Sequence, residues 1–281
     1  VVLALIFAAA IFGGSRQISK ITGVLVPVMG IFYLAVSLFI VVTHYQAIPQ
    51  MFADIFGNAF DLQAIFGGFA GSCVMHGIKR GLFSNEAGVG SAPNAAASAA
   101  VSHPVKQGLV QMLSVFIDTI LICSATAFML LCSGVAPGAD LAGMPWVQAA
   151  ASNSLGGFGT IFITIALCLF AFTTLIGNFY YAEMGLKFLC GRKPGKALIN
   201  AFRVIAALIV LVGATMEFGL VWNMADVLMG LMALINLPVI LILGGPAIRA
   251  MKDYMKQKKE GKDPVFRARD IELRDKTDFW N

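Results

Sequence analysis

A short polar stretch at residues 81–93, Gly-Leu-Phe-Ser-Asn-Glu-Ala-Gly-Val-Gly-Ser-Ala-Pro, interrupts an otherwise apolar part of the chain. A helix in lipid satisfies its own backbone, because hydrocarbon offers no hydrogen bonds. A helix that is broken within the membrane exposes N–H and C=O groups that can hold an ion or a small polar molecule. The stretch therefore predicts a transport site.

Charged residues lie at and just before this stretch: Lys79, Arg80 and Glu86. Charges in hydrocarbon are costly, so they face protein or water and pair with one another. They form either a salt-bridged packing network or the lining of a cavity. Ser84 and Asn85 are expected to cap a new half-helix, whose N-terminus would attract a carboxylate. Glu86 would then orient an ammonium group or shuttle a proton.

A second acidic residue, Asp118, lies in the middle of the apolar residues 107–133, beside Thr119. An acid at this depth is a functional candidate by default. The alternative is that Asp118 is the counter-charge of Lys79 or Arg80.

Two adjacent hydroxyls, Thr173 and Thr174, lie within the apolar residues 160–181. Such hydroxyls commonly bond back to carbonyls of the preceding turn. The alternative is that they supply oxygen ligands for Na⁺. Asn178 follows Thr174 by one helical turn and lies on the same face, so both are candidates to line one cavity.

The composition places these residues in a membrane protein. Of the 281 residues, 58% are hydrophobic and 12% are charged, whereas soluble proteins carry about 25% charged residues. Basic residues cluster at Arg16 and Lys20, at residues 187–196 and after Arg249, while residues 44–61 and 134–159 contain no Lys or Arg. The positive-inside rule makes the basic segments cytoplasmic, so they require no nucleic-acid partner.

The apolar runs predict an all-α, polytopic membrane domain over residues 1–248 and a basic cytoplasmic tail over 249–281. The first run begins at Val1, and we expect the chain to lack its N-terminal part. A turn is expected at 13–16, and a thin helix of small residues within 87–100. The other expected elements are spans at 1–12, 18–43, 107–133, 160–181, 197–213 and 220–243, an amphipathic external helix at 48–60, a broken helix within 63–103 and a short external helix at 144–151.

Known catalytic and metal-binding motifs are missing from the sequence. HExxH, GxSxG and paired ligand spacings do not occur, so we expect no cofactor and no enzymatic activity.

At residues 80–97, with its core Gly-Leu-Phe-Ser-Asn-Glu-Ala-Gly, the chain resembles the alanine or glycine:cation symporter family, the bacterial and archaeal sodium:alanine symporters. The resemblance extends to about Pro246 through further matches at His103-Pro104, Gln107-Gly108, residues 115–119, Cys123, residues 170–174 and residues 180–183.

The resemblance implies a leucine-transporter-type inverted-repeat fold with a discontinuous helix, in which the chain supplies helices four to ten and helices one to three are absent. It implies that Phe83, Ser84, Asn85 and Glu86 bind substrate and that Thr173 and Thr174 bind Na⁺. Asn178 stands where many members carry Trp, which implies a roomier pocket and opens glycine, serine and glutamine as substrates beside alanine.

The expected function is Na⁺-coupled uptake of a small neutral amino acid across a bacterial or archaeal inner membrane. The alternatives are proton coupling through Glu86 or Asp118, a passive channel and, least favoured, a membrane enzyme. Na⁺, the amino acid and membrane lipid are the expected partners.

Overall fold

The computed structural model describes residues 2–60, 69–138, 141, 143–191, 194–273 and 280. Regular structure in this part of the chain is helical, apart from one isolated bridge between Gly138 and Leu141. The predicted all-α class is confirmed. The chain divides into two compact units, Val1–Ser84 with Ile117–Thr215 and Asn85–Phe116 with Met216–Asn281, and each is described by itself.

The first unit contains most of the helices. They are α1 (Val2–Phe12), α2 (Gly14–Thr43), the 3₁₀-helix η1 (Tyr45–Ala47), α3 (Ile48–Ala59), α5 (Phe69–Ser84), the π-helix η2 (Ile117–Cys123), α8 (Ser124–Cys132), α9 (Met144–Leu155), α10 (Gly157–Leu189) and α11 (Lys196–Gly213).

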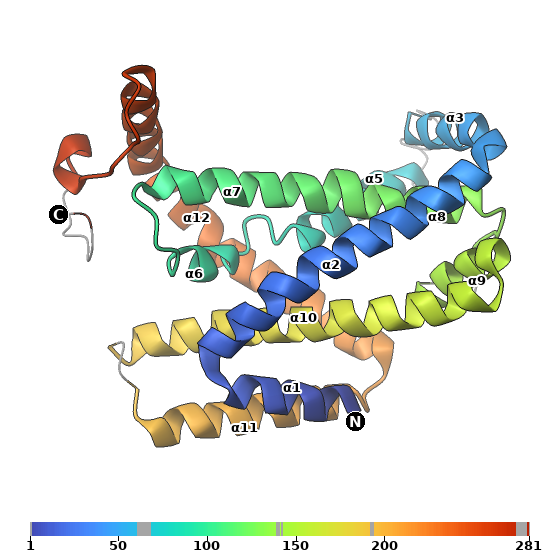
Figure 1. Cartoon of the computed structure of the whole chain (residues 1–281), viewed down its shortest axis with the longest axis horizontal. Helices are drawn as coiled ribbons and strands as arrows, with labels where there is room; N and C mark the ends of the chain where they lie inside the picture. The colour runs from blue at the N-terminus through green and yellow to red at the C-terminus, as the bar shows by residue number, and fades with distance from the viewer. Residues whose placement is uncertain are drawn as a thin grey trace. The chain divides into compact units, whose positions relative to one another are not determined.

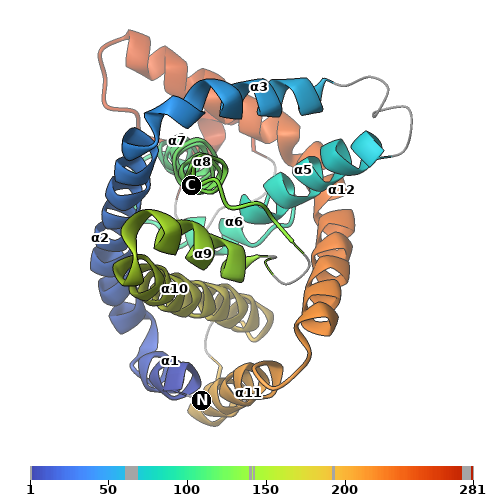
Figure 2. The same ribbon diagram turned by 90° about the vertical axis from the view of Figure 1, so that its right-hand side faces the viewer.

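Two apolar clusters hold the first unit together. In one, Tyr33 of α2 and Met129 of α8 pack with Phe162 of α10, and the Tyr33 hydroxyl lies 2.7 Å from Thr126 Oγ1. In the other, Phe7 of α1 meets Phe179 of α10 edge-on. Figure 1 shows α1 beside α11 and α9 folded back along one end of α10, and Figure 2 shows α2 running from α1 to α3. These contacts fix α10, the helix of Thr173 and Thr174.

The second unit contains α6 (Ala92–Ala96), α7 (Pro104–Phe116), α12 (Phe218–Lys259) and the 3₁₀-helix η3 (Ala268–Ile271). Its apolar cluster joins Ala250 of α12 to Phe266, Ala268 and Ile271 of the following segment. The Phe266 N–H donates to the Ser102 carbonyl at 2.9 Å. The chain after α12 therefore packs back against the loop that precedes α7.

His103 is fully buried beside this cluster. The rings of Tyr254 and Phe266 approach it edge-on, with centroids 5.2 and 5.1 Å away. The Val105 N–H donates to Nδ1 at 3.2 Å, while Nε2 lies 3.3 Å from Asp253 Oδ2. Because Nδ1 accepts a hydrogen bond, the imidazole is neutral and carries its proton on Nε2, which donates to Asp253.

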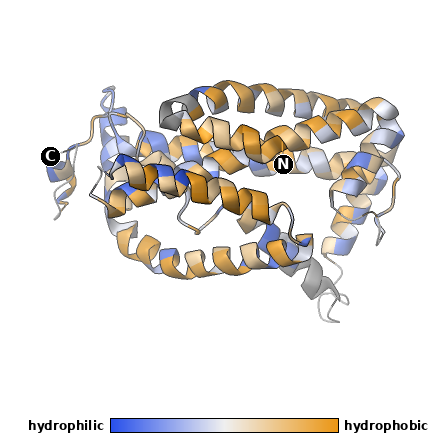
Figure 3. Ribbon diagram, turned by 90° about the horizontal axis from the view of Figure 1, so that it is seen from below, coloured by the Kyte–Doolittle hydropathy of each residue, from blue (hydrophilic) through white to orange (hydrophobic). Residues whose placement is uncertain are grey.

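Five helical segments in the described part of the chain are long and apolar enough to cross a membrane. Much of their apolar surface is exposed, as at Leu241, which is 82% exposed. In Figure 3 apolar residues run along these helices. They are Lys20–Thr43, Pro104–Cys132, Gly157–Leu189, Lys196–Gly213 and Phe218–Lys259.

Several predicted boundaries were wrong. The turn expected at residues 13–16 is confined to Gly13, because α2 already begins at Gly14. α10 extends beyond residues 160–181 at both ends, and α12 continues past Arg249 to Lys259. Lys, Met and Gln favour helix as strongly as apolar residues do, so a helix does not stop where its hydrophobicity stops. The boundary between a membrane domain and a tail at 248/249 stays a prediction.

Candidate functional site

The polar stretch at residues 81–93 begins in the last turn of α5. This helix ends at Ser84, the next seven residues are not helical, and α6 begins at Ala92. The Ser84 hydroxyl donates to Asp118 Oδ2 at 2.6 Å, and its oxygen lies 3.6 Å from Cys123 Sγ. Two residues that sequence reasoning singled out separately, Ser84 and Asp118, therefore lie in direct contact.

Asp118 and Cys123 both lie on the π-helix Ile117–Cys123, in the middle of the candidate span Pro104–Cys132. In a π-helix each hydrogen bond joins residues five apart in place of four, so the regular hydrogen bonding of the α-helix is interrupted. Such segments are frequent at functional sites. Asp118 is half-buried. The end of α5 thus meets the span at its irregular turn.

The residues after Ser84 are held in unusual backbone conformations. Glu86 has a φ of 49°, in the left-handed region, and its Oε2 accepts a hydrogen bond from the buried Ser91 hydroxyl. Gly88 and Gly90 have φ values of 77° and 92°. The Asn236 side chain of α12 donates to the Gly88 carbonyl at 3.0 Å. This segment is therefore fixed by specific contacts within the second unit.

The predicted capping was wrong. Ser84 is the last residue of α5 and Asn85 lies in the turn, whereas the N-cap of α6 is Ser91, which makes no side-chain capping bond. α6 has only five residues, too few for a helix dipole to hold an anion. The thin helix expected within residues 87–100 is likewise mostly turn, because the glycines adopt left-handed conformations that a helix does not allow.

Arg80 and Phe83 lie together near the end of α5. The guanidinium carbon of Arg80 lies 5.6 Å from the centroid of the Phe83 ring, and both side chains are half-buried. An aromatic face attracts a cation at this distance. Phe83 therefore contacts the Arg80 side chain in the last turns of α5.

The predicted sodium ligands lie on α10. The Thr173 hydroxyl donates to the carbonyls of Leu169 and Phe170, at 3.1 and 3.0 Å. Thr173 thus bonds back to carbonyls of the preceding turn, one of the two predicted roles. A hydroxyl that donates its proton still keeps lone pairs with which to bind a cation. Thr174 and Asn178 are exposed on the same helix, one turn apart.

Some of the predicted site residues lie in direct contact, whereas others lie on elements with different neighbours. It brings Ser84 to Asp118 and Arg80 to Phe83. α5 packs on α3 and on the π-helix, whereas α10 packs on α1, α2 and α9. Thr173, Thr174 and Asn178 thus lie on an element whose neighbours differ from those of Ser84.

Sequence reasoning missed Ser91 and Asn236, which hold Glu86 and Gly88 in place. Asn236 carried a signal, because it is a polar side chain within the long apolar run that became α12. Ser91 carried none, because a serine beside glycines is ordinary in a turn.

The model of the sodium:alanine symporter family matches residues 1–268. The chain is 44% identical to the amino-acid carrier protein AlsT of Bacillus subtilis over 280 residues, which is 100% of this chain and 59% of AlsT. It is 42% identical over 265 residues to the probable sodium/glutamine symporter GlnT of the same organism, covering 94% of this chain and 55% of GlnT.

A third relative is archaeal. The chain is 41% identical over 261 residues to the sodium/alanine symporter AgcS of Methanococcus maripaludis, covering 92% of this chain and 56% of AgcS. The chain thus spans between half and two thirds of the length of these relatives. They are named as carriers and symporters, which agrees with the expectation that the chain is not an enzyme.

A family match over nearly the whole chain, relatives that are named as carriers, and five helices able to cross a membrane together identify a multi-pass membrane protein. The chain belongs to the sodium:alanine symporter family.

Proposed function

We propose that the protein couples Na⁺ influx to the uptake of a small neutral amino acid, with the segment after α5 as part of its substrate site. The observation that carries this proposal is the end of α5 at Ser84, whose hydroxyl binds Asp118 on a π-helix in the middle of a candidate span. The seven residues that follow leave the helix in fixed left-handed turns. Main-chain groups outside a helix can bind the carboxylate and ammonium of an amino acid.

In this proposal the break is the discontinuous helix of a leucine-transporter-type fold, and the chain supplies helices four to ten. Phe83, Ser84, Asn85 and Glu86 line the substrate site, with Asn178 widening the pocket. Support comes from the family match and from the side chains that hold the break, Ser91 and Asn236. The membrane would be the inner membrane of a bacterium or archaeon, with the C-terminus in the cytoplasm.

In this proposal Thr173 and Thr174 bind the coupling ion, Na⁺. The relatives GlnT and AgcS are named as sodium symporters. Hydroxyl oxygens suit a hard cation, and the lone pairs of Thr173 stay available while its proton is donated to the helix. Binding of the ion and of the amino acid would then strengthen one another reciprocally.

Uptake of labelled alanine by the full-length protein in liposomes tests the coupling. We expect saturable uptake that depends on an inward Na⁺ gradient. Uptake driven by a pH gradient without Na⁺, and lost in Asp118→Asn or Glu86→Gln, would show proton coupling instead. Uptake that does not saturate and needs no gradient would show a channel.

The site residues are tested by variants in the same assay. Ser84→Ala removes a hydrogen bond to a charged partner, which is worth about 1.5–3 kcal/mol, and we expect uptake to fall at least tenfold. Thr174→Ala should weaken the apparent affinity for Na⁺, whereas Thr164→Ala, an exposed threonine on the same helix, should not. Equal Na⁺ affinity in the two threonine variants would remove α10 from the ion site.

Substrate identity is tested by competition. The relatives are named for alanine and for glutamine, so the name of the family does not fix the substrate of this chain. If Asn178 widens the pocket, unlabelled glutamine and serine should compete with alanine, and Asn178→Trp should abolish competition by glutamine first. Loss of all competitors equally would argue that Asn178 lies outside the pocket.

A further inference from the structure

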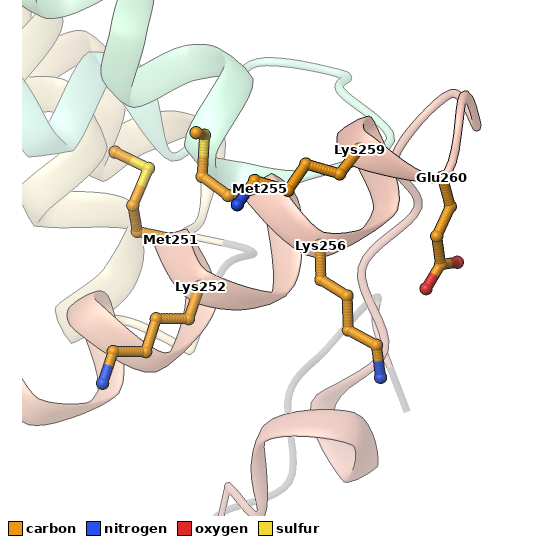
Figure 4. A pocket seen from close by; sticks show the side chains of 6 residues that line it. All are labelled: Met251, Lys252, Met255, Lys256, Lys259 and Glu260. Carbon is orange, nitrogen blue, oxygen red and sulfur yellow. The ribbon is translucent and has the colours of Figure 1, made fainter.

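The C-terminal end of α12 has two chemically different faces. On one face, Asp253 and Tyr254 contact His103 in the loop before α7, and Gln257 donates to the Val265 carbonyl of the chain after the helix at 3.0 Å. The opposite face surrounds a shallow hollow of about 510 Å³, shown in Figure 4 and lined by Met251, Lys252, Met255, Lys256, Lys259 and Glu260.

This second face, the lysine–methionine face, combines cations with apolar side chains. Met251 and Met255 are 38% and 49% exposed, and in Figure 4 they project from one edge of the helix while Lys252 and Lys256 project from the other. Exposed lysines are ordinary on a helix in water, but two exposed methionines one turn apart are not explained by solvation. A helix face that joins an apolar strip to lysines suits the boundary between lipid headgroups and acyl chains.

The charge of the hollow is positive. Its one acidic residue, Glu260, has its Oε2 bound by Lys262 at 2.7 Å, and Lys262 lies outside the hollow. Three lysines and one glutamate line the hollow, and the glutamate is shared between Lys256 and Lys262, so the lining keeps a net positive charge. An ammonium group is a compact point charge that suits a phosphate oxygen.

The length of α12 places this face at the membrane surface. At 1.5 Å per residue the helix from Phe218 to Ile248 is roughly 45 Å long, close to the thickness of a bilayer with its headgroups. Lys252 and Lys256 follow within the next two turns. They thus lie where the phosphates of the cytoplasmic leaflet would be, which rests on the orientation proposed above.

We propose that the lysine–methionine face binds the headgroup of an anionic phospholipid of the cytoplasmic leaflet. The lysines contact the phosphate, and Met251 and Met255 contact the first methylenes of the acyl chain. The stems of the lysines lie along the helix while their ammonium groups reach the polar layer.

Photocrosslinking tests this site independently of transport. The full-length protein is reconstituted with photoreactive phosphatidylglycerol or photoreactive phosphatidylcholine, and crosslinks are mapped by peptide mass spectrometry. We expect phosphatidylglycerol to crosslink preferentially to the end of α12, between Ala250 and Lys259. Each lysine near an anionic surface is worth about fivefold in binding, so Lys252→Gln/Lys256→Gln should reduce the yield at least fivefold, and high salt should reduce it in the wild type.

The matched control is Lys20→Gln/Lys196→Gln, which removes two exposed lysines from other segments predicted to be cytoplasmic. It should leave the crosslinks on α12 unchanged. Equal yields from the two lipids, or equal yields in the two double variants, would overturn the proposal. Complete competition by millimolar inorganic phosphate would show that the face prefers a soluble anion and would also overturn it. Failure of Na⁺-coupled uptake would not alter these yields.

Discussion

Glu86 carries the clearest sign of function among single residues. A side chain other than glycine in the left-handed region costs about 1–2 kcal/mol, and Glu86 adopts that region with a φ of 49°. The hydrogen bond from Ser91 to its carboxylate offsets part of this cost. Strained residues of this kind cluster at ligand sites. Glu86 could be selected from the sequence as a charge in a membrane, but its conformation could not.

Gly90 lies where the turn after α5 meets α12. Its φ is 92°, and a Cβ there would lie 2.8 Å from Cγ of Asn236, the residue whose amide holds the Gly88 carbonyl. Gly90→Ala therefore combines a left-handed alanine, about 1 kcal/mol, with loss of a hydrogen bond, about 1 kcal/mol. We expect a loss of about 2 kcal/mol in the free energy of unfolding in detergent, together with loss of substrate binding.

The control for Gly90→Ala is Gly134→Ala. Gly134 has a similar φ of 72°, but no atom lies within 4 Å of the position of its Cβ. Only the conformational cost applies, so the loss should be about 1 kcal/mol, with substrate binding retained. Equal effects at the two glycines would show that the contact between the turn and Asn236 contributes nothing.

His103 predicts a pH-dependent stability. Burial lowers its pKa below the ordinary value of 6.5, against the opposing effect of Asp253, while Lys106 lowers it further. Between its folded pKa and 6.5 the unfolded chain binds a proton that the folded chain rejects, so stability falls as the pH drops through this window. Thermal unfolding in detergent at pH 7.5 and pH 5.5 should show a lower midpoint at the acidic value.

His103→Gln separates this effect from other titrations. The variant should be less stable at both pH values and should lose part of the difference between them. The hydrogen bond from Lys106 lowers the pKa of Asp263, so Asp263 changes the stability only at a more acidic pH than His103 does. An unchanged pH difference in His103→Gln would exclude His103 as its source.

Whole helices were predictable where apolar runs were long, whereas the π-helix within one of them was not. The expected spans at 18–43, 160–181 and 197–213 correspond to α2, α10 and α11. The π-helix at Ile117–Cys123 leaves no mark on composition, because it changes hydrogen-bond partners and not hydrophobicity. α12 continues through Pro238 and Pro246, since proline is tolerated in apolar helices whose freed carbonyls find other partners.

The hairpin of α9 and α10 depends on one close approach. A Cβ at Gly159 would lie 2.2 Å from the Ala151 carbonyl oxygen, a backbone atom that cannot move alone. We expect Gly159→Ala to separate the two helices and to destabilise the protein by about 3 kcal/mol, as overpacking does. Chemical unfolding followed by tryptophan fluorescence measures this, since Trp146 lies on α9.

Gly157→Ala is the matched control for the hairpin. Gly157 lies two residues earlier on α10, and nothing lies within 4 Å of the position of its Cβ. Its replacement should change stability by no more than about 0.5 kcal/mol, because alanine suits a helix. A small effect at Gly159 as well would mean that α9 is not packed against α10 as described.

Across the whole chain, the residues of the candidate site could be selected from the sequence, but their grouping could not. Ser84 and Asp118 were chosen for different reasons, and their contact depends on packing between elements that are distant in sequence. Thr173 and Thr174 were chosen for their oxygens, and their role depends on neighbours that hydrophobic patterning does not encode. Patterning fixes which helices enter the membrane, while packing fixes which polar groups meet.

The orientation of the chain gives the last prediction. Ala136 lies in the loop between α8 and α9, within a region free of Lys and Arg, and Lys258 lies at the basic end of α12. Three candidate spans separate these residues, so they must lie on opposite sides of the membrane. In full-length protein whose native cysteines are replaced by alanine, an impermeant maleimide should label Ala136→Cys in intact cells and Lys258→Cys only after permeabilisation. Labelling of both cysteines in intact cells would contradict the span assignments. Labelling of Lys258→Cys alone in intact cells would invert the proposed topology and place the lysine–methionine face in the outer leaflet.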